Sequence, residues 1–278
     1  MKILSAILIL WFTVMSYGSS ATQRPNVVLI FADDLGMGML SRYGQKIITT
    51  PNIDLLAQEG IEFTNYHANT YCAPARWSLL NGLHDGRIGA GPHSKGGFIV
   101  KLDRNTPKLS DEQWQRQYDK HIQKLNAKAR IDDDTLFLAQ VAKDVGYRTA
   151  QFGKLDTGFL TWHERVTRHG WDHYVGYYDH ARAHGFYPSY LWKNGNKLPL
   201  KGNPYANAGK RSESGKEPVG TGGETYSQNV LLNEMLSFMR DHKKTIKTNR
   251  FFFITARSCH TVLLRLINYT LIISIGKI

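Results

Sequence analysis

An uninterrupted apolar run near the start of the chain, residues 26–32, constrains the fold more than any other feature. It ends at the polar break Asp33-Asp34-Leu35-Gly36. Its short length and its β-branched residues are typical of a strand buried on both faces of a parallel sheet. The run therefore predicts an α/β fold, in which helices cover the sheet.

Segments of helical and strand character alternate along the rest of the chain. A short helix is predicted at 53–60, after Thr50-Pro51, and residues 61–66 alternate as a strand would. Further along, we predict a helical insertion at 110–130, a helix at 134–146, a strand at 147–153, a helix at 226–240 and a strand at 251–256. Residues 92–109 and 201–223 are predicted loops, whereas the pattern of 261–278 fits a strand pair, a helix or a foreign tail.

The chain carries 35 Lys and Arg against 23 Asp and Glu, a formal net charge of +12 over 278 residues. Such an excess favours acidic partners, including sulfated glycans, nucleic acids and anionic surfaces. The sequence has neither zinc-finger spacing nor an Arg-rich helix interleaved with aromatic residues, so we predict no nucleic-acid partner.

The first 21 residues have the three parts of a secretory signal peptide. The basic tip Met1-Lys2 precedes an apolar run over 3–15, and the small residues Ser19-Ser20-Ala21 follow. The apolar run is shorter than the roughly 20 residues that span a bilayer, so we predict no stable membrane insertion. Residues 1–21 are therefore interpreted as a signal peptide, and the mature chain as secreted, periplasmic or in an endomembrane lumen.

Asp33 and Asp34 follow the first predicted strand, at the carboxyl end where open parallel sheets bind ligands. Two adjacent carboxylates repel each other unless a cation or protons neutralise them. Because Leu35-Gly36 breaks the strand, both can turn toward one ion, and all-oxygen ligation suits Ca²⁺ or Mg²⁺. The alternative is an ordinary solvated loop.

Residues 71–82 form a predicted short helix with a candidate nucleophile at its beginning. Pro74 suits the first turn, which puts Cys72 at the amino terminus, where the helix dipole favours negative charge. Arg76 lies one turn further on the same face, so the pair can receive a tetrahedral oxyanion. Cys259 is the second of two cysteines, and in a secreted chain the alternative is a disulfide between them.

The pattern Cys-x-Pro-x-Arg, followed by Leu80 and Gly82, resembles the signature of type I, formylglycine-dependent sulfatases. Other segments resemble arylsulfatase-like members of this family, within the alkaline phosphatase superfamily: residues 24–36, 50–60, 146–154, 170–178 and 183–188. The resemblance extends over residues 24–94, 132–200 and 224–260. It implies a mixed, mostly parallel sheet flanked by helices, with residues 22–260 forming the amino-terminal part of a sulfatase catalytic domain.

The resemblance also implies a nucleophile and a metal site. Cys72 would be oxidised to formylglycine by a formylglycine-generating or anaerobic maturation enzyme. Its hydrate would join Asp33 and Asp34 around Ca²⁺, with Mg²⁺ as the alternative, because an oxygen suits calcium better than a soft thiolate does. One hydroxyl of the hydrate would attack the sulfur and displace the alcohol, and the second would then expel sulfate and regenerate the aldehyde.

Basic side chains would bind the sulfate group. The resemblance assigns this role to Arg76 and Lys154 and a substrate contact to His260, with His184 as a candidate lining residue. Preorganised positive charge of this kind typically dominates catalysis. The implied reaction is hydrolysis of an aryl or carbohydrate sulfate ester.

Three features depart from the family pattern. Ala75 stands where the family usually has serine, and Asp156 where it carries a histidine. Residues 261–278 resemble no part of the family, whose members continue to a later Asp-Asn or Asp-His pair that completes the metal site. We therefore expect an incomplete sheet and an atypical tail, and two states of the chain are open: an active sulfatase, or a product inactive through truncation. The alternatives are a phosphonate or phosphate monoester hydrolase of the same superfamily, or a non-catalytic secreted fragment that binds sulfated glycans.

Overall fold

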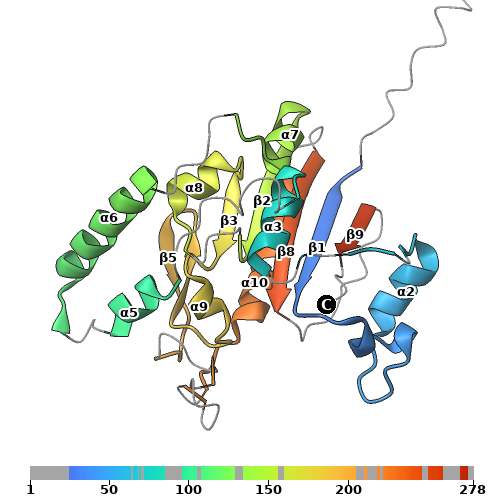
Figure 1. Cartoon of the computed structure of the whole chain (residues 1–278), viewed down its shortest axis with the longest axis horizontal. Coiled ribbons are helices and arrows are strands. Elements are labelled where there is room, and N and C mark those ends of the chain that lie inside the picture. Colours follow the sequence, from blue (N-terminus) through green and yellow to red (C-terminus); the bar gives the residue numbers. More distant parts are fainter. Residues whose placement is uncertain are drawn as a thin grey trace, which may run out of the picture.

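A computed structural model describes most of the chain, and a seven-stranded sheet forms its centre (Figure 1). The described residues are 25–63, 65–67, 69, 72–84, 96–104, 108–128, 134–155, 160–204, 210–211, 218–219, 222–245, 250–258 and 270–274. The sheet has the order β5-β4-β3-β2-β8-β1-β9. Its strands are β1 (Val27–Asp33), β2 (Tyr147–Gly153), β3 (His173–Gly176), β4 (Tyr190–Lys193), β5 (Asn196–Pro199), β8 (Arg250–Ser258) and β9 (Thr270–Ser274).

Strands β3, β2, β8, β1 and β9 pair in parallel, whereas β4 and β5 add an antiparallel hairpin at one edge. The predicted mixed, mostly parallel sheet is confirmed. The predicted strands at 26–32, 147–153 and 251–256 correspond to β1, β2 and β8. A separate short pair joins β6 (Lys210–Arg211) to β7 (Pro218–Val219).

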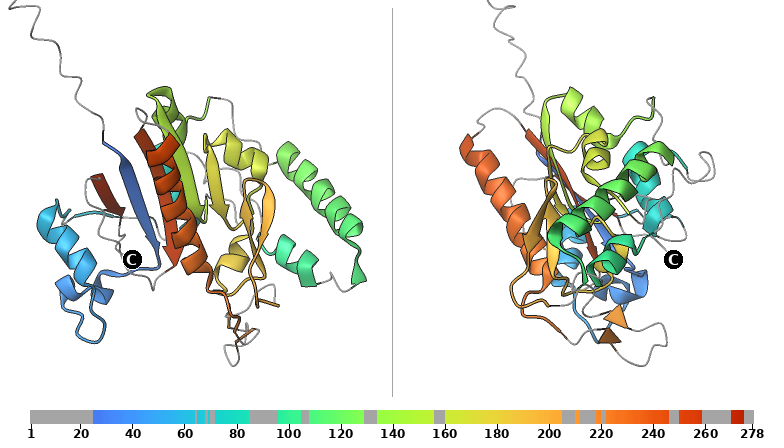
Figure 2. Two further views of the ribbon diagram at one scale, coloured as in Figure 1. Left: turned by 180° about the vertical axis from the view of Figure 1, so that it is seen from behind. Right: turned by 90° about the vertical axis from the view of Figure 1, so that its left-hand side faces the viewer.

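Helices cover both faces of the sheet, as the apolar run of β1 requires. The helices of the described chain are α2 (Pro51–Glu59), α3 (Cys72–Asn81), α5 (Phe98–Arg104), α6 (Asp111–Lys128), α7 (Leu138–Asp144), α8 (His163–Arg168), α9 (His180–Ala183) and α10 (Ser227–Thr245), with 3-10 turns η1 (Met37–Met39) and η2 (Ser41–Tyr43). Helix α10 packs on one face, and α3 and α7 lie on the other (Figure 2). No helix in the described ranges is both long and apolar enough for a membrane span.

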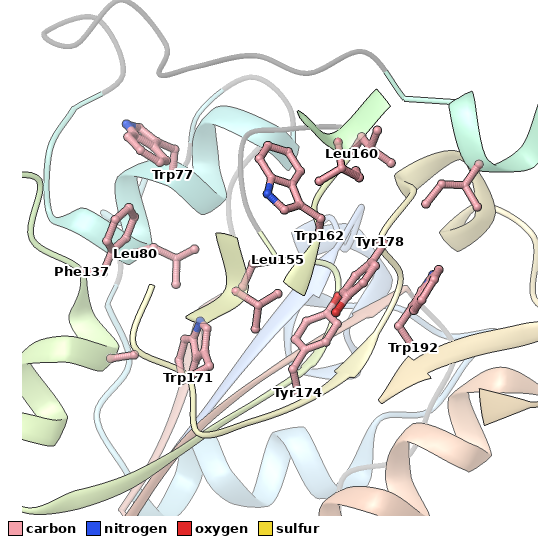
Figure 3. Close-up of a cluster of buried hydrophobic side chains, with 14 of the residues drawn as sticks. Trp77, Leu80, Phe137, Leu155, Leu160, Trp162, Trp171, Tyr174, Tyr178 and Trp192 are labelled. Carbon is pink, nitrogen blue, oxygen red and sulfur yellow. The ribbon is translucent and has the colours of Figure 1, made fainter. Parts of the chain in front are cut away.

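Successive residues of β1 supply the two cores, because side chains alternate across a strand. Val28 faces the α10 side and packs in a cluster with Phe238. Leu29 faces the other side and joins a cluster with Leu80, Trp77 and other aromatic residues, several of which Figure 3 shows. Burying each such large side chain contributes about 1.5–3 kcal/mol.

The strand predicted at 61–66 does not form. Ile61 and Phe63 are 86% and 74% exposed, so the alternating apolar side chains face solvent and not a core. Glu62 instead binds Arg42 and Tyr43 of η2, which holds the segment beside the 3-10 turns. A strand forms only where a neighbouring strand satisfies its backbone, and this segment has none among the described residues.

The predicted loop at 92–109 needs correction, and the tail, which the pattern left open, contains a strand. Helix α5 lies within the predicted loop 92–109, because buried Asp179 accepts the backbone N–H groups of Gly97, Ile99 and Val100 and so supports the start of that helix. In the tail, β9 extends the sheet by pairing in parallel with β1. The signal peptide at 1–21 lies outside the described residues and stays a prediction.

Gly176 allows the end of β3 to approach the end of β2 closely. A Cβ atom at this position would overlap the backbone carbonyl of Gly153 and meet the Tyr174 hydroxyl. We expect Gly176→Ala to lower the free energy of unfolding by about 1–3 kcal/mol, as other overpacked sites do. Urea denaturation measures this, with Gly36→Ala as the matched control because no atom lies within 4 Å of its added Cβ. Equal stability of the two variants would contradict the prediction.

Candidate active site

The carboxyl ends of β1 and β2 bring together the charged residues predicted from the sequence. Strand β8 lies between these two strands, with Phe31 of β1 and Gly153 of β2 both paired to Ala256. Asp33 is the last residue of β1, and Lys154 directly follows β2. Open parallel sheets bind ligands outside the carboxyl ends of their strands, where these residues lie.

Asp33 is the centre of a buried ion-pair network. Its Oδ1 accepts a hydrogen bond from Nη2 of Arg76 at 2.9 Å, and its Oδ2 accepts one from Nζ of Lys154. All three residues are nearly inaccessible, at 4%, 2% and 4% exposure for Asp33, Arg76 and Lys154. The network joins β1, α3 and the residue after β2.

The electrostatics of the network keep Asp33 ionised. Burial alone would raise the pKa of this carboxyl, because desolvation disfavours the charged form. The positive charges of Arg76 and Lys154, and their hydrogen bonds, outweigh burial and hold the pKa of Asp33 well below its ordinary value. One carboxylate therefore faces two cations, which leaves a net positive charge in a buried position.

Arg76 has a hydrogen-bond donor to spare. Its Nη1 donates to the backbone carbonyl of Lys154 at 3.4 Å, and its guanidinium lies 5.0 Å from the centre of the Phe31 ring. Its Nε is buried and has no acceptor among the described residues. A buried unpaired donor is costly, so this atom marks a place where a ligand oxygen would be bound.

Two further residues lie beside Lys154. His184 places its Nε2 3.5 Å from Nζ of Lys154, and its role in lining a substrate pocket stays a prediction. Gln151 of β2 donates from its amide to the carbonyl of Lys154 at 2.8 Å, and its buried Oε1 has no donor in the described ranges. The sequence analysis missed Gln151. The available signal in the sequence was a polar amide between the apolar residues Ala150 and Phe152 of the predicted strand.

Cys72 is the first residue of α3, one helical turn before Arg76. Buried Pro74 occupies the first turn, as predicted. Because residues four apart share a helix face, Cys72 lies on the side of α3 that contacts the Asp33 network. Its thiol is partly buried and forms no disulfide among the described residues, and Cys259 lies outside them.

Other predicted site residues are not brought into this network. Asp34 is exposed and adopts a left-handed backbone conformation with φ of 58°, which ends the strand at this point. His260 and Asp156 lie outside the described residues, so their predicted places in the site are untested. Ala75 lies in α3, next to Arg76.

The donors at the end of β1 suit a hard cation in kind but form an incomplete set. Asp33 and Asp34 offer carboxylate oxygens, which Ca²⁺ and Mg²⁺ prefer. Consecutive residues of a strand point to opposite faces of the sheet. The left-handed backbone at Asp34 ends the strand, so this alternation does not apply to the two carboxylates. In the described part of the chain, no three His, Cys, Asp or Glu side chains gather as a metal site.

Comparison with known proteins identifies the class and then the family. The sheet and its charged edge define an α/β protein of the alkaline phosphatase-like fold, the fold of its sulfatase neighbours among solved structures. The Sulfatase family model matches residues 25–268. The chain belongs to the sulfatase family.

Curated relatives are similar to part of the chain. Identity is 29% over 175 residues to steryl-sulfatase of Homo sapiens, covering 60% of this chain and 26% of that protein. It is 33% over 138 residues to N-acetylgalactosamine-6-O-sulfatase of Bacteroides thetaiotaomicron, covering 49% and 21%. The arylsulfatase of Klebsiella aerogenes is 32% identical over 149 residues, covering 53% and 27%. These matches span about a quarter of each relative's length.

Solved structures share the fold over more of the chain. A crystal structure of Ps i-CgsB in complex with k-i-k-neocarrahexaose superposes with a TM-score of 0.58 at 22% identity, covering 86% of this chain and 46% of that one. The PsFucS1 sulfatase from Pseudoalteromonas sp. gives a TM-score of 0.52 at 17% identity, covering 87% and 45%. The chain thus spans about half the length of these structures.

Proposed function

We propose that this chain is the sulfate-binding part of an enzyme that hydrolyses sulfate esters of aryl or carbohydrate alcohols. The observation that carries the proposal is the unpaired, buried Nε of Arg76 beside Lys154. Two cations held by one carboxylate suit a sulfuryl group, whose oxygens carry negative charge. Membership of the sulfatase family supports the same reaction.

We infer that the nucleophile derives from Cys72 through oxidation to formylglycine by a maturation enzyme. The hydrated aldehyde would supply the hydroxyl that attacks sulfur. A calcium ion, or magnesium as the alternative, held by Asp33, Asp34 and the oxidised Cys72 would supply charge stabilisation for the sulfuryl oxygens.

The chain's own residues orient and stabilise the ester. Arg76 and Lys154 would each donate to sulfuryl oxygens, while Asp33 fixes both cations so that no reorganisation is needed as charge develops. His184, at 3.5 Å from Lys154, would face the alcohol portion of the substrate. We propose that His260 is a further contact to the substrate.

The proposed substrate class is a sulfated glycan or a small aryl sulfate. The structure of Ps i-CgsB holds a neocarrahexaose, and the relative from Bacteroides thetaiotaomicron is named as acting on N-acetylgalactosamine-6-O-sulfate groups. The net charge of +12 would attract such anions. We also propose that residues 1–21 direct the chain to a secretory route, where the maturation enzyme would meet it.

The test of this proposal is turnover by chain coexpressed with a formylglycine-generating enzyme. We expect the Cys72 peptide to show the mass of the aldehyde and to react with an aldehyde probe. The protein should cleave an aryl sulfate faster than the matching aryl phosphate, and Cys72→Ala should reduce turnover to the buffer background. The control Ser78→Ala changes the same helix two residues past Arg76 and should keep activity.

Each other outcome selects an alternative. Faster cleavage of the phosphate ester would indicate a phosphate or phosphonate monoester hydrolase. Retention on a sulfated-glycan column without any turnover would indicate a non-catalytic binding fragment. A free thiol at Cys72 after coexpression, or a disulfide to Cys259, would exclude the formylglycine mechanism.

A further inference from the structure

A pocket lies between α6 and α8, away from the Asp33 network. It has a volume of about 430 Å³, within the range of about 300–1,000 Å³ that is typical of small-molecule sites. Helix α6 forms one wall and the first turn of α8 the other. The side chains that concern its chemistry are Gln115, Tyr118, Asp119, Asn126, Glu164 and Tyr178.

The pocket shares no lining residue with the Asp33 network. Gly195 on its wall lies in the turn between β4 and β5, and the neighbouring Asn194 accepts a hydrogen bond from the backbone N–H of Tyr174, near the start of β3. This part of the pocket wall lies near the starts of the parallel strands, whereas Asp33 and Lys154 lie at or just past the ends of β1 and β2. Figure 1 shows α6 beyond β5, on the side of the sheet away from β1. A ligand here would not contact the Asp33 network.

A buried hydroxyl in the pocket lacks an acceptor. Tyr178 is 1% exposed, and its ring is stacked on Trp192 and Tyr174 at centroid distances of 4.5 and 5.6 Å (Figure 3). No acceptor among the described residues takes the proton of its hydroxyl, although the backbone N–H of Gly195 approaches the oxygen. Such an unpaired buried group costs stability unless a ligand or water satisfies it.

The pocket walls present both free donors and free acceptors. Asn126 uses its Oδ1 to accept from Trp162 at 2.6 Å, and its two amide hydrogens have no acceptor among the described residues. Within the described part of the chain, Asp119 accepts one hydrogen bond, from Gln115, which leaves lone pairs on its carboxylate for a ligand. Glu164 has no ion-pair partner among the described residues. No lysine or arginine lines the pocket to balance these two carboxylates.

We propose that this pocket binds an unsulfated, neutral saccharide unit. A sulfate or phosphate would be repelled by the two carboxylates. An ammonium group would satisfy the carboxylates but offers no acceptor to Tyr178 or Asn126. Sugar hydroxyls donate and accept at once, so they alone among these three classes match every open group of the pocket.

The test is binding of a panel of unsulfated hexaoses to the full chain by saturation-transfer NMR, followed by titration. The probes are the hexaoses of glucose, galactose, mannose and N-acetylglucosamine. We expect at least one to bind, and Tyr178→Phe and Glu164→Gln each to weaken binding by about tenfold, the equivalent of one lost hydrogen bond to a charged or buried group. Glu112→Gln is the matched control, because Glu112 is an exposed carboxylate of α6 that does not line the pocket.

Three outcomes would overturn the proposal. The first is that no hexaose binds, and the second is that both pocket variants bind the sugar as tightly as the wild type does. The third is that the polyamine spermidine displaces the sugar and binds Tyr178→Phe as tightly as it binds the wild type. Hydrolysis of a small aryl sulfate, measured on the same variants, separates this site from the proposed function. Such activity should be unchanged in Tyr178→Phe and Glu164→Gln, and its absence from the wild type would leave the binding result intact.

Discussion

Asp33→Asn should lower the free energy of unfolding by about 3–5 kcal/mol, the cost of removing one partner from a buried ion pair. The substitution keeps the size of the side chain but leaves Arg76 and Lys154 as two buried cations without a countercharge. Urea denaturation followed by tryptophan fluorescence measures the change. Asp34→Asn is the control, because Asp34 is exposed and asparagine tolerates its left-handed backbone, so its effect should stay within about 0.5 kcal/mol.

The same pair of proteins should reveal the titration of Asp33. Its pKa in the folded state lies well below the value of about 3.9 expected for the unfolded chain. The carboxylate therefore contributes stability that is fully present above about pH 5, and this contribution is lost as the pH falls through the folded pKa. The stability difference between wild type and Asp33→Asn should be constant at neutral pH and shrink below about pH 4.

A compensating variant distinguishes charge from packing. Replacing Lys154 by methionine in the Asp33→Asn background removes one of the two uncompensated cations while keeping an unbranched side chain. We expect this double variant to recover part of the lost stability. A loss below about 1 kcal/mol in Asp33→Asn, or no recovery in the double variant, would contradict the proposed role of Asp33 as countercharge.

The parallel core of the fold could be predicted from the sequence because its strands carry local signals. The apolar run of β1 and the β-branched and aromatic residues of β2 and β8 indicate strands whatever their neighbours are. The antiparallel hairpin β4–β5 was not predicted, since its short strands depend on pairing with β3. The false strand at 61–66 shows the converse, because alternation alone does not create a partner strand.

The candidate site was predicted unevenly for a similar reason. Asp33, Arg76 and Lys154 belong to contiguous motifs, so the resemblance to a family found them without knowledge of their contacts. That Asp33 would bind both cations depends on β1, α3 and β2 meeting in space. Gln151 and Tyr178 lie within the family-like segments 146–154 and 170–178, but the resemblance gave neither residue a role. Only burial of their polar atoms reveals them.

A second buried ion pair holds the α5–α6 segment to the sheet and gives the other large expected effect. Asp103, in α5, forms an ion pair with Arg182 of α9, whose side chain is 1% exposed. Asp103 also accepts hydrogen bonds from Nε1 of Trp114 in α6, at 3.0 Å, and from the Tyr190 hydroxyl in β4, at 3.2 and 3.1 Å. One carboxylate thus joins four elements.

Asp103→Asn should lower the free energy of unfolding by about 3–5 kcal/mol, because it leaves Arg182 as a buried cation without a countercharge. Hydrogen exchange should accelerate most in α5 and α6, the elements that Asp103 attaches to the sheet. The control is Glu112→Gln in α6, which removes the exposed ion pair of Glu112 with Arg116 at 3.7 Å. This substitution should lower the free energy of unfolding by less than about 0.5 kcal/mol.

The double variant Asp103→Leu with Arg182→Met tests whether charge is the cause. In the wild type the Arg182 guanidinium lies 3.9 Å from the centre of the Tyr190 ring. Removing both ions at once puts apolar side chains in their place, beside this ring. Buried ion pairs replaced by apolar residues of similar volume are often as stable as the original. The double variant should therefore be more stable than Asp103→Asn. If it is less stable, the hydrogen bonds of Asp103 to Trp114 and Tyr190, and not its charge, hold α5 and α6 in place.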